Sequence, residues 1–159
     1  MAYLTRLRWK QNTAAFREYL ALTILVHMTR RYLSQELPYE EEDLAVKIGV
    51  PLSALQDIIE DFMEHFLVCR TVAPQGLILG QPPENVSVLE VLQLVCHKES
   101  PPRESYPKTG DPVGSLLRKR DQAISESLDG VNLKMLAEEE PASFTILDPP
   151  SLLVDKEVS

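Results

Sequence analysis

The residues whose side chains do metal or nucleophilic chemistry are few and widely spaced in this chain. Cysteine occurs twice, at Cys69 and Cys96, and histidine three times, at His27, His65 and His97. No two histidines have the His-x-His or His-x-x-x-His spacing that brings two ring nitrogens to one metal ion. A metal-dependent hydrolase would need histidines and aspartates clustered so that they activate water. We therefore predict no enzyme, no catalytic residue, no metal site and no cofactor.

The two thiols have other expected roles. Cys69 occupies a predicted strand position, where a free cysteine behaves as a small buried hydrophobic residue. A single thiolate does not hold an iron–sulfur cluster. The one remaining route to a metal site is a symmetric dimer that brings together two copies of Cys96 and His97.

A run of four carboxylates, from Glu40 to Asp43, is a second feature with chemical potential. Negative charge at the start of a helix interacts favourably with the helix dipole. A helix is predicted to begin at this run, so we expect the carboxylates to have a structural role rather than a catalytic one.

Composition and charge limit the class of protein. The chain has 159 residues and a mass of 18.0 kDa, the size of one domain with appendages. Its formal charge is −8, from 16 basic and 24 acidic residues. Residues 1–31 hold six basic residues and one glutamate, a net charge of +5, so the rest of the chain carries −13. No run approaches the ~20 apolar residues that span a bilayer, and the first residues lack the pattern of a secretory signal.

Apolar spacing predicts three helices in the first half of the chain. Residues 13–35 form a long helix with a broad apolar face, and a short helix covers residues 40–48. Gly49 suits the left-handed turn that ends the short helix. Pro51 suits the first turn of a third helix that runs to His65. Two helices joined by a short glycine-containing turn are typical of a helix-turn-helix.

A hairpin is predicted directly after this motif. Strands over residues 67–72 and 77–79 are joined by a turn over 73–76. Ser87 and Glu90 then form a predicted capping box at the start of another helix. The fold class is therefore mainly α: a winged helix-turn-helix with a three-helix core, a short β-hairpin wing and additional C-terminal helices.

Proline placement divides the chain into segments. Six of the twelve prolines fall between Pro82 and Pro112, and three more lie in the last nineteen residues. Proline removes a backbone donor and breaks helices, so these stretches are connections or tails. The predicted domains are a basic N-terminal segment (1–12), a winged-helix domain (13–97), a Pro-rich linker (98–112), a C-terminal helical segment (113–140) and a mobile tail (141–159).

Together, these motifs match a known pattern over about 125 residues. They are an opening helix at 14–34, Leu-Ala-x-x-Ile-Gly-Val at 44–50, a wing at 67–80, a Val-rich helix start at 86–91 and closing helices at 113–137. This arrangement resembles the Rrf-type winged-helix regulators of bacteria, which include iron–sulfur-sensing and nitric-oxide-sensing repressors. The resemblance implies DNA binding and dimerisation through the helix after the linker. Those sensors hold their cluster with three cysteines, of which only Cys96 has a counterpart here.

A second resemblance rests on the first helix. It is carried by Phe16-Arg17-Glu18-Tyr19-Leu20-Ala21-Leu22, His27 and Arg31-Tyr32-Leu33. This stretch is similar to the C-terminal cytoplasmic winged-helix domain of YihY/BrkB-type inner-membrane proteins, the so-called ribonuclease BN family. The resemblance implies a membrane-spanning region upstream of residue 1, and a position at the cytoplasmic face of the bacterial inner membrane. Arg6, Arg8 and Lys10 would then be membrane-proximal, as the positive-inside rule requires.

Charge decides between the two functions that these resemblances imply. From Ile48 to Cys69 there is no lysine or arginine, and the predicted second helix of the motif carries four carboxylates. Such a surface repels DNA phosphates. We therefore predict a non-catalytic cytoplasmic interaction or regulatory module, part of or associated with an integral membrane protein, and no nucleic-acid partner. The alternative is a DNA-binding transcription regulator of the Rrf type that lacks an iron–sulfur cluster.

The segment from Val113 to Ala137 has a sparse apolar face. It predicts either a homodimer contact or docking onto the chain's own core, and both remain open. The expected partner is a second copy of the chain or another protein. The predicted contact residues are Leu116, Leu117, Ala123, Ile124 and Leu128.

Overall fold

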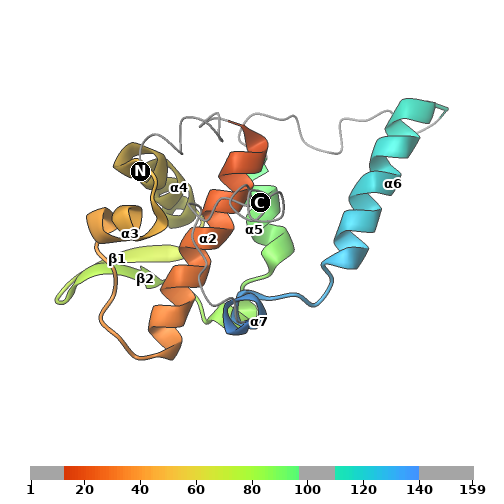
Figure 1. The fold of residues 1–159 in the computed structure, drawn as a ribbon. Coiled ribbons are helices and arrows are strands. Elements are labelled where there is room, and N and C mark those ends of the chain that lie inside the picture. Colours follow the sequence, from red (N-terminus) through yellow and green to blue (C-terminus); the bar gives the residue numbers. More distant parts are fainter. Residues whose placement is uncertain (1–12, 97–109, 140–159) are drawn as a thin grey trace, which may run out of the picture.

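A computed structural model describes residues 13–96 and 110–139 (Figure 1). It confirms the predicted fold class, a mainly helical winged helix with one small hairpin. The elements are α2 (Ala14–Leu33), α3 (Glu41–Ile48), α4 (Leu52–Glu64), β1 (Val68–Val72), β2 (Gln75–Leu79), the 3₁₀ helix η1 (Pro83–Asn85), α5 (Val88–Cys96), α6 (Pro112–Ser127) and α7 (Leu133–Glu138).

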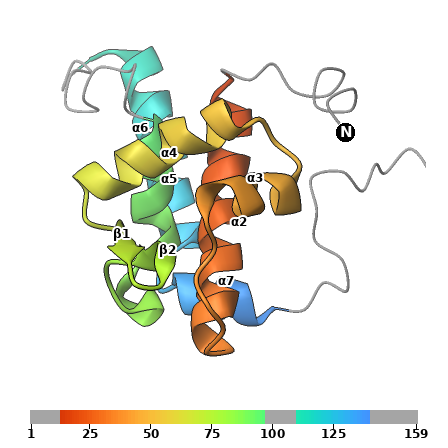
Figure 2. The ribbon, with the colours of Figure 1, turned by 90° about the vertical axis from the view of Figure 1, so that its left-hand side faces the viewer.

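Helix α2 is the centre of the molecule, and the other body elements pack around it. The Thr13 hydroxyl caps its start by accepting a hydrogen bond from the Phe16 N–H at 3.2 Å. Ten of its twenty residues are buried, which explains the broad apolar face in the sequence. Figure 2 shows α4 crossing α2 near its N-terminal end, while α7 lies near its C-terminal end.

The helix-turn-helix forms as the glycine and proline predict. Gly49 has a φ of 86°, and its N–H donates to the Ala45 carbonyl at the end of α3. Pro51 then precedes α4. One face of α4 is fully packed into the core, because Leu55, Ile58, Ile59 and Phe62 are each at most 1% exposed. This packing leaves the opposite face of α4 to solvent.

The hairpin is tighter than the sequence predicted. Its antiparallel register pairs Val68 with Leu79 and Val72 with Gln75, so β2 begins two residues before the predicted Leu77. The wing is tied to the body where the Leu77 N–H donates to the Tyr39 carbonyl at 2.8 Å.

Cys69 corrects one expectation. Its side chain is exposed, not buried. Side chains alternate between the two faces of a strand, and Val68 takes the inward position, so its neighbour faces outward.

The end of the described chain folds back onto α2. Helix α7 inserts Leu133, which is 0% exposed, into the core. Arg30 of α2 holds the end of α7 by donating to the carbonyls of Ala137 at 3.0 Å and Glu139 at 2.9 Å. Ser87 forms an isolated bridge with Asn132 and so joins the start of α5 to the start of α7.

Helix α6 stands clear of this body (Figure 1). Its start is capped by Asp111, whose carboxylate accepts from two backbone N–H groups. Gly114 is its one buried residue, and among the described elements none packs closely against it.

Several predicted segments lie outside the described residues. These are the basic segment 1–12, most of the linker 98–112 and the tail 141–159, so the domain boundaries stay predictions. Within residues 13–96 and 110–139, no helix combines the length and apolarity needed to cross a membrane.

Two phenylalanines close to each other in sequence test the core assignment. Phe62 is 0% exposed, whereas Phe66 is 74% exposed and has a φ of 59°, a region that bulky residues rarely adopt. We expect Phe62→Ala to lower the free energy of unfolding by about 3–5 kcal/mol, measured by denaturant titration. Phe66→Ala should change it by no more than about 0.5 kcal/mol. Equal losses in the two variants would contradict the core described here.

His27 gives the fold a pH dependence. The residue is 6% exposed, and within the described part of the chain its Nε2 has no hydrogen-bond partner. Its ring meets the Tyr39 ring edge-on, with centroids 6.5 Å apart. Burial, with smaller contributions from Arg30 and Lys47, lowers the pKa of His27 from 6.5 to about 4. The histidine is therefore neutral in the folded protein near neutral pH.

Acidification should destabilise the fold through this histidine. Between the folded pKa of about 4 and the unfolded value of 6.5, the unfolded chain binds one more proton, so stability falls as pH falls through this window. This difference between the folded and unfolded pKa of His27 corresponds to roughly 3 kcal/mol of folding free energy. When the free energy of unfolding is measured by denaturant titration across this pH range, its slope against pH should be shallower for His27→Leu than for the wild type. An unchanged slope in His27→Leu would refute this assignment.

Candidate nucleic-acid interface

The exposed face of α4 is a stripe of four polar residues. Ser53, Asp57, Glu60 and Glu64 are all exposed and recur at intervals of four, three and four, which places them on one side of the helix. In a helix-turn-helix, the second helix enters the major groove of DNA. This stripe is therefore the surface of α4 that a duplex would meet.

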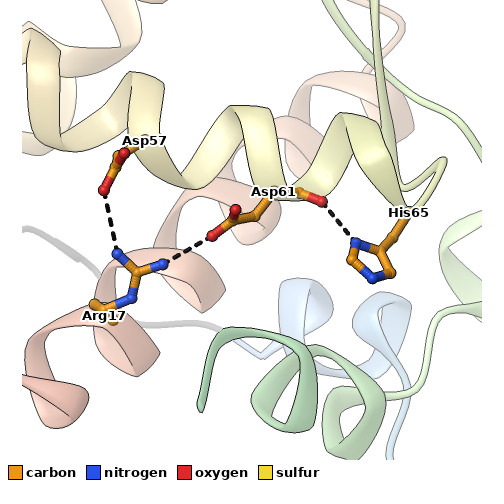
Figure 3. A network of polar contacts seen from close by, with 4 residues as sticks. All are labelled: Arg17, Asp57, Asp61 and His65. Atoms are coloured by element: carbon orange, nitrogen blue, oxygen red, sulfur yellow. Dashed lines mark hydrogen bonds and ion pairs between the residues drawn. The ribbon is translucent and has the colours of Figure 1, made fainter. Parts of the chain in front are cut away.

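Arg17 of α2 neutralises two carboxylates of α4 (Figure 3). Its guanidinium donates to Asp57 at 3.3 Å and to Asp61 at 2.8 Å. The Asp61 side chain is 6% exposed and that of Asp57 is 59% exposed, so the inner pair is shielded from solvent and the outer pair is not. His65 sits one turn further on, with its Nδ1 2.9 Å from the Asp61 carbonyl. This network fixes α4 against α2.

Glu41 joins three elements of the motif. Its Oε1 accepts from Arg70 Nε of β1 at 2.7 Å, and its Oε2 accepts from the Gln56 amide of α4 at 3.0 Å. The Glu41 side chain is only 14% exposed. One carboxylate at the start of α3 thus holds the wing and α4 in a fixed relation.

These contacts change how the charge of the motif is interpreted. Residues 40–70 hold eight carboxylates against two cations, Lys47 and Arg70, a net charge of −6. Three of the eight carboxylates, those of Glu41, Asp57 and Asp61, are paired with arginine. The motif remains acidic, but less of its negative charge faces solvent than the sequence alone suggested.

A hollow of about 420 Å³ separates the start of α3 from the wing. Glu40, Glu42 and Val72 are among its lining residues, and Val72 at the wing tip is 91% exposed. The wing therefore projects beside the start of α3, with an apolar residue at its tip.

Of the cysteine, histidine and basic residues that the sequence singled out as candidate sites, the structure describes Cys96 and not the others named here. Cys96 Sγ donates to the Glu18 carboxylate at 2.7 Å. His97 and the predicted membrane-proximal residues Arg6, Arg8 and Lys10 lie outside the described residues. In the described ranges, no three metal-ligating side chains of His, Cys, Asp or Glu come together.

The predicted docking residues all lie on α6 or directly after it. Leu116 is 66% exposed and Ile124 39%, Ala123 is exposed, and Leu117 and Leu128 are half-buried. Val113, which is 62% exposed, was not predicted but lies one turn before Leu116. The helix thus presents apolar side chains to solvent instead of docking them on the body.

The two arginine networks were missed in the sequence. Arg17 lies 40 and 44 positions from its partners, and pairs at such separations leave no local pattern. The one available signal was a cation next to Phe16 on the apolar face of a helix, where a charge needs a partner.

The inner ion pair can be tested by a double-mutant cycle. Arg17→Met removes the cation that pairs with the buried Asp61. We expect this change to lower the free energy of unfolding by up to about 3 kcal/mol, the low end of the cost of breaking a buried ion pair. Arg17→Met combined with Asp61→Leu should recover much of this loss. Asp57→Asn, at the exposed end of the same network, should cost less than about 1 kcal/mol. Additive single-mutant losses for Arg17 and Asp61 would contradict the coupling.

Comparison with known proteins gives the fold and no close relative. No family model matches the chain, and no curated protein matches it. Among solved structures, the global cysteine regulator CymR (YrzC) of B. subtilis has a TM-score of 0.62 at 19% identity, over 79% of this chain and 95% of that one. Staphylococcus aureus CymR has a TM-score of 0.59 at 21% identity, over 79% and 98%. IscR of T. potens has a TM-score of 0.61 at 20% identity, over 81% and 89%.

These neighbours correct the main functional prediction. They are Rrf-type winged-helix regulators and not enzymes, in accord with the prediction of no enzyme. They favour the alternative, a DNA-binding regulator, over a membrane-associated module without a nucleic-acid partner, so the latter prediction was wrong. Nothing supports the YihY/BrkB-type resemblance. The physical reason for the error is that the carboxylates of the motif were counted without their arginine partners. At these identities, the likeness establishes the shared fold and leaves function to be proposed.

Proposed function

We propose that this chain is a DNA-binding transcription regulator of the Rrf type, without an iron–sulfur cluster, that acts as a homodimer. The observation that carries the proposal is the presentation of α4. One whole face of this helix is exposed beside a projecting wing, and the relation between the two is fixed by the Glu41 contacts with Arg70 and Gln56. The solved structures that share the fold support it.

The exposed residues of α4 would read base edges in the major groove. A carboxylate accepts a hydrogen bond from the cytosine amino group, and a serine hydroxyl can also contact base edges. Ser53 and Asp57 lie in the N-terminal half of α4, the part that contacts bases in this class of motif. Because the motif carries −6, we expect weak sequence-independent binding and a large contribution from base contacts.

Helix α6 would make the dimer. Its exposed apolar residues need a partner in water, and another copy of the same helix is apolar in the same places. A two-fold dimer would place two α4 helices on half-sites roughly 34–36 Å apart, one turn of the duplex. The chain has two cysteines in all, too few in one copy for the three-cysteine cluster of the resembled sensors. The predicted position at the bacterial inner membrane has no finding that bears on it.

DNA binding can be measured directly. Fluorescence anisotropy of a labelled random-sequence duplex should show saturable binding at about 50 mM salt that weakens steeply by about 200 mM. Glu60→Gln removes one negative charge from the stripe and should tighten binding. Glu126→Gln, the same change on α6, should not. No anisotropy change up to about 100 μM protein at the lower salt would refute the proposal.

The dimer can be measured by light scattering. We expect a mass of twice 18.0 kDa for the wild type and of one chain for Leu116→Glu combined with Ile124→Glu. Val46, on α3, is 72% exposed, so Val46→Glu is a matched control that should leave the dimer intact. A wild-type monomer, or a double variant that stays dimeric, would contradict self-association through α6.

A further inference from the structure

A second hollow in the body lies between the C-terminal end of α4 and helix α5. It has a volume of about 570 Å³ and is lined by side chains from the end of α4, from both sides of the hairpin and from α5. His65, drawn in Figure 3 at the end of α4, is one of these lining residues. Small-molecule sites in proteins have volumes of about 300–1,000 Å³, so the hollow is large enough for a small organic ligand.

The inner wall of this hollow is apolar and its rim is acidic. Leu67 is 8% exposed and Leu94 is half-buried, whereas Glu64 and Glu90 are exposed. Within the described ranges, the lining contains no lysine or arginine, and no ion pair engages Glu64 or Glu90. Two carboxylates without a cation, one from α4 and one from α5, therefore line the same hollow.

The neutral polar side chains of the lining add further acceptors. The Nδ1 atom of His65 lies 2.9 Å from the Asp61 carbonyl oxygen. A carbonyl oxygen only accepts, so Nδ1 carries the hydrogen of this bond, and Nε2 of the neutral ring is an acceptor. Gln81 and Gln93 each contribute an amide oxygen. The hollow thus offers acceptors and negative charge to an occupant that carries N–H donors and positive charge.

We propose that this hollow binds an organic dication, two primary ammonium groups joined by a short hydrocarbon chain. One ammonium pairs with Glu64 and the other with Glu90, while the chain lies against Leu67 and Leu94. Charge complementarity selects the two cations, and the apolar wall selects the chain between them. A hydrated metal ion such as Mg²⁺ keeps several of its waters and gains nothing from the two leucines.

An occupant of this site also changes the charge that α4 presents. Glu64 is the last residue of the exposed stripe of α4, so an ammonium paired with it removes one negative charge from the surface that a duplex would meet. This consequence rests on the proposed function. The site itself does not, because binding of the dication is measured without DNA.

An NMR titration of the full chain with cadaverine, a five-carbon chain with an amine at each end, tests the site at constant ionic strength. We expect backbone amide shifts at residues 64–67 and 90–94 that saturate with a Kd of at most about 5 mM. The monoamine n-pentylamine has the same chain and one cation, so it should bind several-fold more weakly. Equal affinity for the two amines would overturn the pairing of one ammonium with each carboxylate.

A matched pair of double variants locates the binding. Glu64→Gln combined with Glu90→Gln removes both proposed partners and should raise the cadaverine Kd roughly tenfold, the effect of losing two exposed ion pairs. Glu40→Gln combined with Glu42→Gln removes the same charge from the other acidic hollow and should leave the Kd unchanged. Equal effects in the two double variants would overturn the site, because the attraction would then be a general property of an acidic protein.

The outcomes also separate this site from the proposed function. Shifts that fail to saturate up to about 20 mM cadaverine would overturn the site and leave DNA binding standing. Saturable shifts at residues 64–67 and 90–94 support the site even if duplex anisotropy shows no binding, a result that would refute the proposed function alone.

Discussion

The structure depends on one constraint, the burial of α2. Half of this helix is removed from water, and it packs against α3, α4, α5, α7 and β2. The helix-turn-helix therefore has no separate core and is placed by its contacts with α2. Where α4 crosses α2, the apolar packing ends in the Arg17–Asp61 pair, which gives the crossing a polar, directional contact (Figure 3). Apolar contacts tolerate sliding more readily than a hydrogen-bonded ion pair does, so Arg17 fixes the position in which α4 is presented.

Charge is the second constraint, and it shapes how the protein could use its fold. An acidic recognition helix gains little from counterion release, the general source of affinity for DNA. Pairing Glu41, Asp57 and Asp61 with arginines reduces this penalty but does not remove it. A regulator built in this way would depend on base contacts and on a second copy of the chain. The exposed apolar residues of α6 fit the second need.

Local signals in the sequence predicted the fold well. The apolar face of residues 13–35, Gly49, Pro51 and the paired strand patterns each act over a few residues, and the structure contains the elements they indicate. Contacts between distant residues left no such signal. Arg17 and Glu41 were missed for this reason, and the function was misjudged as a result. Cys69 was misplaced because a strand pattern does not say which of two alternating faces is covered.

The central claim is that α4 reads a DNA sequence as part of a two-fold dimer. The most direct measurement is selection of duplexes from a random library by the full chain, followed by sequencing of the bound fraction. The account predicts enrichment of an inverted repeat whose half-site centres lie about one helical turn apart, and loss of that motif when Asp57 is replaced by asparagine. A bound fraction with the same sequence composition as the starting library would contradict it.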